Sequence, residues 1–168
     1  MRPAIDIRHA EVADAAAMAA YMAALMAEAP DTISRRPDPS VDEERAWITA
    51  TAADDRALIL VATCGQAVIG LLDLSADERP AYRHAARFGM SVGRAWRGQG
   101  VGRRLLQAAI AEARAWPGLC RIELECVPWN AAGLALYERL GFRIEARKAK
   151  AINLRGQPED LLLMALVW

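Results

Sequence analysis

A glycine-rich segment in the second half of the chain has the composition of an anion-binding turn. Its sequence is Arg97-Gly98-Gln99-Gly100-Val101-Gly102-Arg103-Arg104, with glycine at three alternate positions and arginine on both sides. A helical pattern follows at once, and the first N–H groups of a helix have no backbone partners. These N–H groups and the helix dipole attract an anion, typically by about 0.3–1 kcal/mol at an exposed end. The segment therefore predicts a site for a phosphate group.

The spacing of the glycines separates this turn from the common nucleotide-binding motifs. A P-loop needs a Lys-Ser or Lys-Thr pair after its last glycine, and the turn has none. The dinucleotide fingerprint is G-x-G-x-x-G, whereas Gly98, Gly100 and Gly102 follow the spacing G-x-G-x-G. A flexible loop before a helix is the alternative that the turn alone leaves open.

Length and composition limit the class of protein. The chain has 168 residues, of which 54% are hydrophobic, and its 21 basic residues balance its 21 acidic ones. These values predict a single domain over residues 1–168 and argue against nucleic acid as a partner, because a nucleic-acid-binding protein has a basic excess. Cys64, Cys120 and Cys126 show no metal-ligand spacing, so we expect neither a bound metal nor a disulfide framework.

The same features bear on location. Few cysteines without a disulfide pattern are typical of the reducing cytoplasm, which is the predicted compartment. The N-terminus, Met1-Arg2-Pro3-Ala4-Ile5-Asp6, carries charge where a signal peptide needs an apolar core. The alanine-rich stretch 12–29 contains Asp14 and Glu28, so it fits an amphipathic helix better than a membrane span, and no membrane partner is expected.

The residue pattern predicts a mixed α/β domain with the order β-α-α-β-β-β-α-β-α-β-β. Helices are expected at 15–27, with Asp14 as its cap, at 41–52, after the capping-box pair Ser40 and Glu43, and at 100–116 and 130–140. Strict alternation makes 121–127 the clearest strand and places Glu123 and Glu125 on one face. Gly89 predicts a bulge or a close backbone approach. The strands are expected at 5–8, 57–63, 67–74, 84–92, 121–127, 143–152 and 160–168.

Three segments give this order a family resemblance. Arg97–Gly102 resembles the Q/R-x-x-G-x-G/A signature of the GCN5-related N-acetyltransferases, and Phe88–Val92 is similar to the bulged central strand of that family. Asn130–Phe142 is similar to its second signature, N-x-x-A-x-x-L-Y-x-x-x-G-F, with Gly133 where alanine is usual. The resemblance covers about Ile5 to Trp168 and implies a largely antiparallel sheet with a central splayed parallel pair.

The resemblance also implies acetyl-CoA as the co-substrate. In the family, main-chain groups at the strand bulge hold the pantetheine arm like one more strand and help to stabilise the oxyanion. The N–H groups of the glycine turn hold the pyrophosphate. The residues then expected to bind acetyl-CoA are Met90, Ser91, Val92, Arg97, Gly98, Gln99, Gly100, Val101, Gly102, Arg103, Asn130 and Tyr137. Arg104 either joins them or is a solvated side chain.

Acetyl transfer to an amine removes a proton from the amine and gives one to the departing thiolate. Tyr137 matches the tyrosine of the family and is predicted to be the general acid, because a phenol with a pKa of about 10 is protonated at neutral pH. Glu125 is a candidate base or substrate contact, at an offset before Asn130 that some family members use. His84 is the other candidate for these roles, and solvent is a third. No histidine partner is visible for Cys126, so a covalent acetyl-cysteine route is not expected.

The acceptor is the least defined part of the reaction. Candidate contacts in the segment 21–47 are Arg35, Arg36, Asp38 and Asp42. The tail Lys150–Met164 resembles a bacterial subgroup that includes enzymes for amino acids and other small amines, so we expect a small primary amine. A protein or peptide N-terminus is the alternative, and a non-catalytic acyl-CoA sensor or scaffold is the alternative of another class. The apolar run 161–168 could pair across a homodimer.

Overall fold

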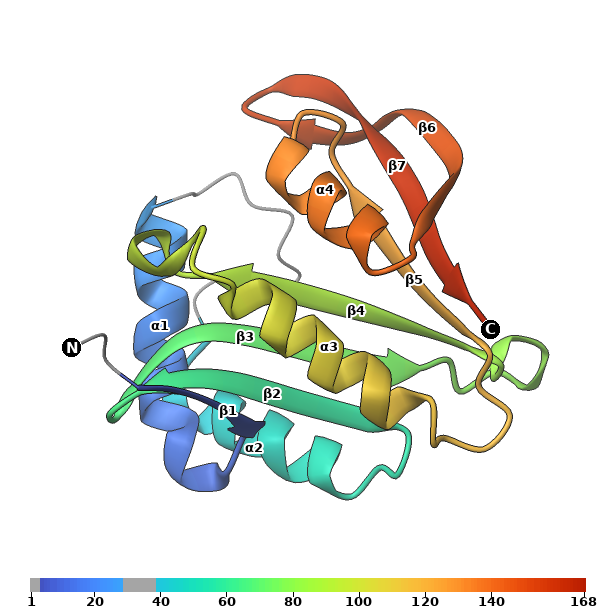
Figure 1. The fold of residues 1–168 in the computed structure, drawn as a ribbon. Coiled ribbons are helices and arrows are strands. Elements are labelled where there is room, and N and C mark those ends of the chain that lie inside the picture. Colours follow the sequence, from blue (N-terminus) through green and yellow to red (C-terminus); the bar gives the residue numbers. More distant parts are fainter. Residues whose placement is uncertain (1–3, 29–38) are drawn as a thin grey trace. The chain divides into compact units, whose positions relative to one another are not determined.

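The computed structural model describes residues 4–28 and 39–168, and its mixed α/β fold confirms the predicted element order (Figure 1). In this part of the chain, seven strands form one sheet in the order β1-β2-β3-β4-β5-β7-β6. β4 and β5 are parallel, whereas β1–β2, β2–β3, β5–β7 and β6–β7 are antiparallel pairs. The strands are β1 (Ile5–His9), β2 (Ala57–Cys64), β3 (Ala67–Ala76), β4 (Ala85–Val92), β5 (Arg121–Cys126), β6 (Arg143–Leu154) and β7 (Gln157–Val167). The α-helices are α1 (Ala15–Glu28), α2 (Val41–Ala52), α3 (Val101–Ala113) and α4 (Ala131–Arg139).

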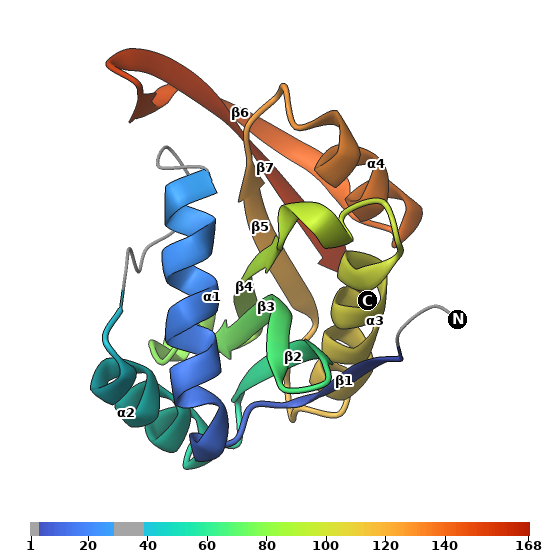
Figure 2. The same cartoon turned by 90° about the vertical axis from the view of Figure 1, so that its left-hand side faces the viewer.

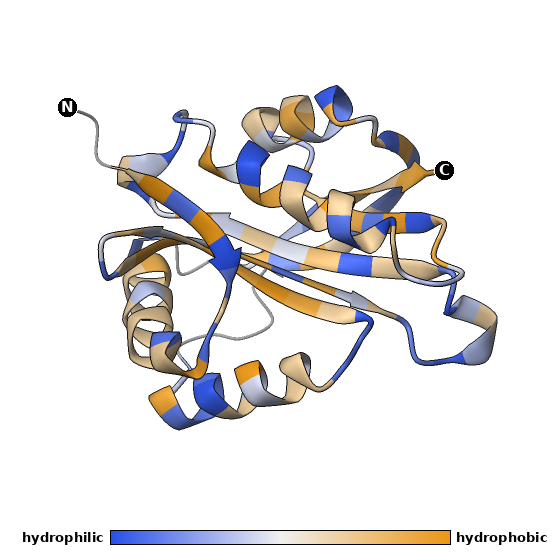
Figure 3. Cartoon of the chain, turned by 60° about the horizontal axis from the view of Figure 1, so that its bottom comes forward, coloured by the Kyte–Doolittle hydropathy of each residue, from blue (hydrophilic) through white to orange (hydrophobic). Residues whose placement is uncertain are grey.

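The chain divides into two compact units, and the first consists of Met1–Ser75 and Gly89–Trp116. Within it, α1 and α2 lie on one face of strands β1–β3 and α3 lies on the other (Figure 2). Met18, Ile48 and Val61 belong to the buried cluster under α1 and α2. β2 and β3 are apolar along most of their length, as the orange colour in Figure 3 shows. Helices therefore have to cover both faces of these strands.

The second unit consists of Ala76–Phe88 and Pro117–Trp168. Its parallel pair runs in register from Ala85 opposite Arg121. β6 and β7 form a hairpin whose turn residues Arg155 and Gly156 have φ of +55° and +74°. Positive φ at both central positions is the mark of a type I′ turn, which matches the twist of the strands it joins. The core includes Phe142, which is fully buried.

Local signals at the start of α1 and α2 had different outcomes. The capping box is confirmed, because Ser40 Oγ accepts a hydrogen bond from Glu43 N–H (3.2 Å) and Glu43 Oε2 accepts one from Ser40 N–H (2.7 Å). The predicted cap of α1 by Asp14 is wrong, because a 3₁₀ turn over Val12–Asp14 precedes that helix. The Asp14 carboxylate instead accepts from Glu11 N–H (2.8 Å) and pairs with Arg8 (2.6 Å). It therefore joins the start of the helix to β1.

Candidate functional site

The glycine turn precedes α3 in the first unit. Gly98 and Gly100 have φ of +72° and +82°, which favours glycine, and Gly100 is the N-cap of the helix. A Cβ at either position would meet no atom within 4 Å, so packing does not explain these glycines. The first helical hydrogen bond joins Arg104 N–H to Gly100 O (3.0 Å). The N–H groups before it point out of the helix end, where an anion can bind them.

Arg97 fixes the path from β4 into this turn. Its Nε donates a hydrogen bond to Val92 O (2.8 Å), and its Nη2 lies 2.9 Å from Glu28 Oε1 at the end of α1. Glu28 also accepts from Arg94 N–H at 3.4 Å. The guanidinium is therefore held by the protein, and an anion at the turn would share it with Glu28.

The other polar side chains of the turn differ in how they are held. Gln99 Nε2 donates to Ala95 O (2.8 Å), and Arg104 Nη2 donates to Ile5 O (3.1 Å). Arg103 is exposed and has no hydrogen-bond or ion-pair partner among residues 4–28 and 39–168. Of the two arginines, Arg103 has the guanidinium that is more available to a phosphate group.

The second half of β4 is supported by α1. Tyr21 Oη donates a hydrogen bond to Ser91 Oγ (2.9 Å), and burial raises the pKa of Tyr21 to about 12. A Cβ on Gly89 would lie 2.8 Å from Asp73 Oδ1, which agrees with the close approach expected at this glycine. The sequence alone does not predict this contact, because Tyr21 and Ser91 are 70 positions apart.

Tyr137 lies on α4 in the second unit. Its ring is 9% exposed and makes edge-to-face contacts with Phe88 (5.9 Å between centroids) and Phe142 (6.0 Å). Burial, with a smaller effect of Cys126, raises the pKa of Tyr137 well above its usual value. Its hydroxyl has no hydrogen-bond partner in the described part of the chain. A packed ring with an unused, fully protonated hydroxyl suits a proton donor.

Asn130 and Cys126 stand at either end of the loop that leads into α4. Asn130 is the N-cap, and its Oδ1 accepts a hydrogen bond from Gly133 N–H (3.0 Å). A Cβ on Gly133 would lie 2.5 Å from Asn130 Nδ2, so the glycine at this position leaves room for the cap. Burial raises the pKa of the Cys126 thiol, which disfavours the thiolate that covalent catalysis would need.

Glu125 lies on the face of β5 that the alternation predicts, and its carboxylate forms an ion pair with Lys148 of β6. Its neighbour Glu123 pairs with Arg121 (2.6 Å) and Arg87 (3.2 Å). Both carboxylates of this strand are therefore engaged. For Glu125 to act as a base, Lys148 has to move away or leave one carboxylate oxygen of Glu125 accessible to the acceptor amine.

His84 is exposed and lies immediately before β4. Its carbonyl oxygen accepts a hydrogen bond from Cys120 N–H (3.0 Å), just before β5 begins. Glu125 is five residues further along that strand, a distance of about 16 Å at the usual strand rise. The structure thus places these two candidate bases at opposite ends of β5 and does not bring them together.

Three of the candidate acceptor contacts, Arg35, Arg36 and Asp38, lie outside the described residues. Asp42 lies in the first turn of α2 and pairs with Arg45 (2.7 Å). No α-helix within 4–28 or 39–168 is long and apolar enough to cross a membrane. The same residues hold no group of three or more His, Cys, Asp or Glu side chains arranged to bind a metal ion.

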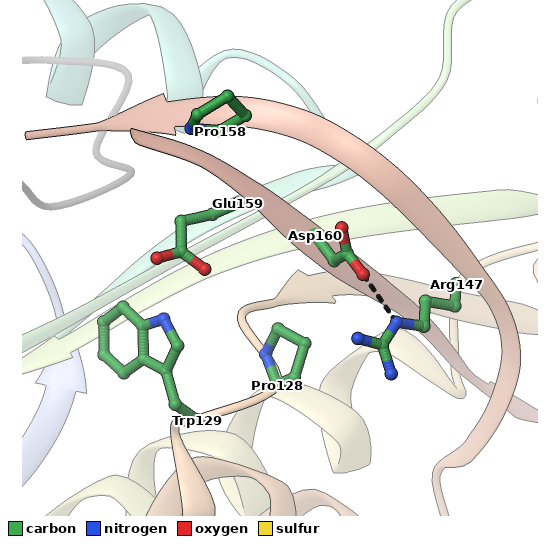
Figure 4. Close-up of a pocket in the computed structure, with 6 residues that line it drawn as sticks. All are labelled: Pro128, Trp129, Arg147, Pro158, Glu159 and Asp160. Atoms are coloured by element: carbon green, nitrogen blue, oxygen red, sulfur yellow. Dashed lines mark hydrogen bonds and ion pairs between the residues drawn. The ribbon is translucent and has the colours of Figure 1, made fainter. Parts of the chain in front are cut away.

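An open pocket of about 470 Å³, which the sequence does not predict, lies beside the start of α4 (Figure 4). Trp129, immediately before Asn130, is 62% exposed and lines this pocket. The lining residues of the pocket come from three separate segments of the chain, which explains why no sequence motif predicts it. The only local signal is an apolar side chain next to a predicted cap. The lining residues are Pro128, Trp129, Arg147, Pro158, Glu159 and Asp160.

Known proteins match this chain over most of its length. The sequence model of the acetyltransferase (GNAT) family matches residues 19–142. The L-amino acid N-acetyltransferase AaaT of Escherichia coli is 31% identical over 163 residues, which are 97% of this chain and 98% of that protein. The ribosomal protein uS5-alanine N-acetyltransferase of Escherichia coli is 32% identical over 99 residues, 59% of this chain and 50% of that protein. The yncA protein of Salmonella typhimurium, solved with its cofactor acetyl-CoA, is 27% identical, with a TM-score of 0.86 over 98% of this chain and 94% of its own.

Proposed function

The chain belongs to the acetyltransferase (GNAT) family and is an acetyl-CoA-dependent N-acetyltransferase, and we propose that its acceptor is the primary amine of an amino acid or another small amine. The observation that carries this proposal is the match to an L-amino acid N-acetyltransferase along 97% of the chain. A peptide N-terminus is the second candidate, since the uS5-alanine N-acetyltransferase matches a shorter part, 59% of the chain.

We propose that the donor is held by the residues that the signatures mark. The N–H groups from Gly98 to Arg103 bind the pyrophosphate, and the unpartnered guanidinium of Arg103 adds positive charge. Main-chain groups of Met90–Val92 bind the pantetheine arm, on a strand that Tyr21 supports through Ser91. Arg97 shapes the turn through Val92 and Glu28.

In the proposed reaction, the neutral amine attacks the carbonyl carbon of the thioester. A C–N bond forms, and the carbonyl oxygen takes the negative charge near a main-chain N–H of β4. The C–S bond then breaks, and Tyr137 Oη gives its proton to the departing sulfur. One feature of Tyr137 supports this role: its hydroxyl, which is protonated at neutral pH, has no partner among the described residues.

The proton of the attacking amine goes to Glu125 in this proposal, with His84 and water as the other candidates. Glu125 lies on β5 before the loop to Asn130, and its carboxylate is paired with Lys148, which has to move or leave one oxygen accessible before Glu125 can accept the proton. Profiles of kcat/KM against pH for the wild type and Glu125→Gln test the assignment. Loss of the acidic limb in the variant supports Glu125, and an unchanged acidic limb shows that another base acts.

The acceptor class is tested by measuring thiol release from acetyl-CoA against a panel of L-amino acids, simple amines and short peptides. We expect the highest kcat/KM with amino acids or small amines. A higher value with peptides whose N-terminus is the only amine would favour the second candidate. Failure of the whole panel would contradict the proposed acceptor.

A further inference from the structure

The pocket beside α4 offers three groups that the reaction above leaves unused: the Glu159 carboxylate, the outer edge of the Arg147 guanidinium and the indole of Trp129. We propose that this pocket binds the acceptor, and that Arg147 and Glu159 recognise the carboxylate and the ammonium group of a free α-amino acid. The inference rests on the proposed function and narrows it, because it requires an acceptor that carries an ammonium group and a carboxylate group on the same carbon atom.

Arg147 supplies the site for the carboxylate. Its Nε donates a hydrogen bond to Asp160 Oδ2 (2.6 Å), while its side chain remains 65% exposed. Its terminal nitrogens have no partner among residues 4–28 and 39–168. The other oxygen of Asp160 accepts from Lys150 N–H (2.8 Å), so that carboxylate is fully used within the protein. Asp160 is therefore a positioning residue, and the outer edge of Arg147 can take a second carboxylate in paired hydrogen bonds.

The backbone of β6 is distorted shortly after this arginine. The register with β7 shifts between Lys148 and Ile152, and Lys150 has a φ of +52°. A non-glycine residue rarely adopts this conformation, and here the hydrogen bond to Asp160 holds it. Strand irregularities of this kind redirect side chains beside binding sites. The pocket wall is thus a fixed feature of the hairpin and not a regular strand edge.

Glu159 and Trp129 supply the site for the ammonium group. Figure 4 shows the Glu159 carboxylate and the Trp129 indole turned toward the same open space. Within the described residues, Glu159 has no hydrogen-bond or ion-pair partner. An ammonium group there would meet a carboxylate and an aromatic face together, a combination that favours cations. Pro128 and Pro158 add rigid apolar walls for a side chain.

The charged groups of the pocket that have no partner within the described part of the chain determine which acceptors it binds best. With Asp160 engaged, the pocket presents one free carboxylate and one free guanidinium edge, which are the complement of a zwitterion. A simple amine or a peptide N-terminus brings an ammonium group without an adjacent carboxylate. Either would leave Arg147 unpaired in the bound state. The pocket therefore favours free α-amino acids.

The test compares L-amino acids with their α-carboxamides, which keep the amine and lose the carboxylate charge. We would measure kcat/KM for both sets with the wild type, Arg147→Gln, Arg147→Lys and Glu159→Gln. Arg143→Gln is the matched control, since Arg143 is an exposed arginine of the same strand outside the pocket. Acids and amides differ in amine basicity, but this difference is the same for every variant and cancels when the acid-to-amide ratio of a variant is compared with that of the wild type.

We expect Arg143→Gln to keep the wild-type ratio of kcat/KM for acids to that for amides, and Arg147→Gln to lower this ratio at least about tenfold, since it loses a hydrogen bond between charged groups. Arg147→Lys should give a ratio between those of the wild type and Arg147→Gln, with the KM for acetyl-CoA unchanged in both variants. Glu159→Gln should lower kcat/KM for acids and amides by a similar factor, because both carry the ammonium group.

Two results would overturn the assignment while leaving the proposed function in place: an acid-to-amide ratio that is unchanged in Arg147→Gln, or an equal fall of this ratio in the control Arg143→Gln. A wild type that acetylates neither set would contradict the proposed function itself, and the pocket assignment would fall with it.

Discussion

At the scale of single residues, Tyr137 combines a packed ring with an unused hydroxyl. The substitution Tyr137→Phe keeps the ring that contacts Phe88 and Phe142 and removes only the proton donor. We expect kcat to fall at least about tenfold, because a positioned proton transfer typically contributes about 10²–10⁴-fold, with little change in the KM for acetyl-CoA. Steady-state kinetics with the best acceptor measure both values. Full activity in this variant would remove Tyr137 from the role of general acid.

At the scale of elements, the N-terminus of α3 depends on glycine for its backbone and not for space. Gly100 has a φ of +82° with an open position for Cβ, and Gly118 matches it with a φ of +72° and equal space. Gly100→Ala and Gly118→Ala should each cost about 1–2 kcal/mol of unfolding free energy, because both force alanine into the left-handed region. Only Gly100→Ala should raise the KM for acetyl-CoA. Equal KM values in the two variants would separate the turn from donor binding.

The N-cap of α4 depends on the glycine at position 133. Alanine at position 133 would displace the Asn130 side chain, whose Nδ2 lies 2.5 Å from the added Cβ. We expect Asn130→Ala to cost about 1 kcal/mol in the wild type, as for other N-caps, and much less when Gly133→Ala is already present. Chemical denaturation of the two single variants and the double variant measures this coupling. Additive effects would mean that the cap survives beside an alanine.

These elements also show what the sequence could predict. The capping box of Ser40 and the alternation of β5 are local patterns, and each determined its element correctly. The pair of Tyr21 with Ser91 depends on tertiary packing, which no local pattern specifies. The distortion at Lys150 had no signal either, because its φ of +52° is held by a residue on another strand. The glycine turn before α3 is a local pattern as well and was predictable, whereas the pocket beside α4 was not.

At the scale of the whole molecule, the predicted site residues are divided between the two units. The boundary between them falls within β4, after Phe88, so one continuous strand belongs to both. We propose that residues 1–168 act as a single catalytic domain. A single domain unfolds in one cooperative transition, which calorimetry can detect.

The stability of the molecule should fall in alkaline solution. The pKa of Tyr21 rises from 10.0 to about 12 on folding, chiefly through burial. A raised folded-state pKa stabilises the protein fully below pH 10, and this stabilisation is lost as the pH rises through 12. We expect a loss of about 2–3 kcal/mol from this group in that interval. Denaturation at several pH values should give a flatter curve for Tyr21→Phe; an equally steep curve would contradict the assignment.

We propose that this acetyltransferase joins the acetyl group of acetyl-CoA to the amine of a free amino acid. The most direct measurement is NMR of the products formed from carbon-13-labelled acetyl-CoA and the best L-amino acid of the panel. We expect the label in an amide on the α-nitrogen, with one equivalent of coenzyme A released. Label found only in acetate, or only on a peptide N-terminus offered in competition, would contradict it.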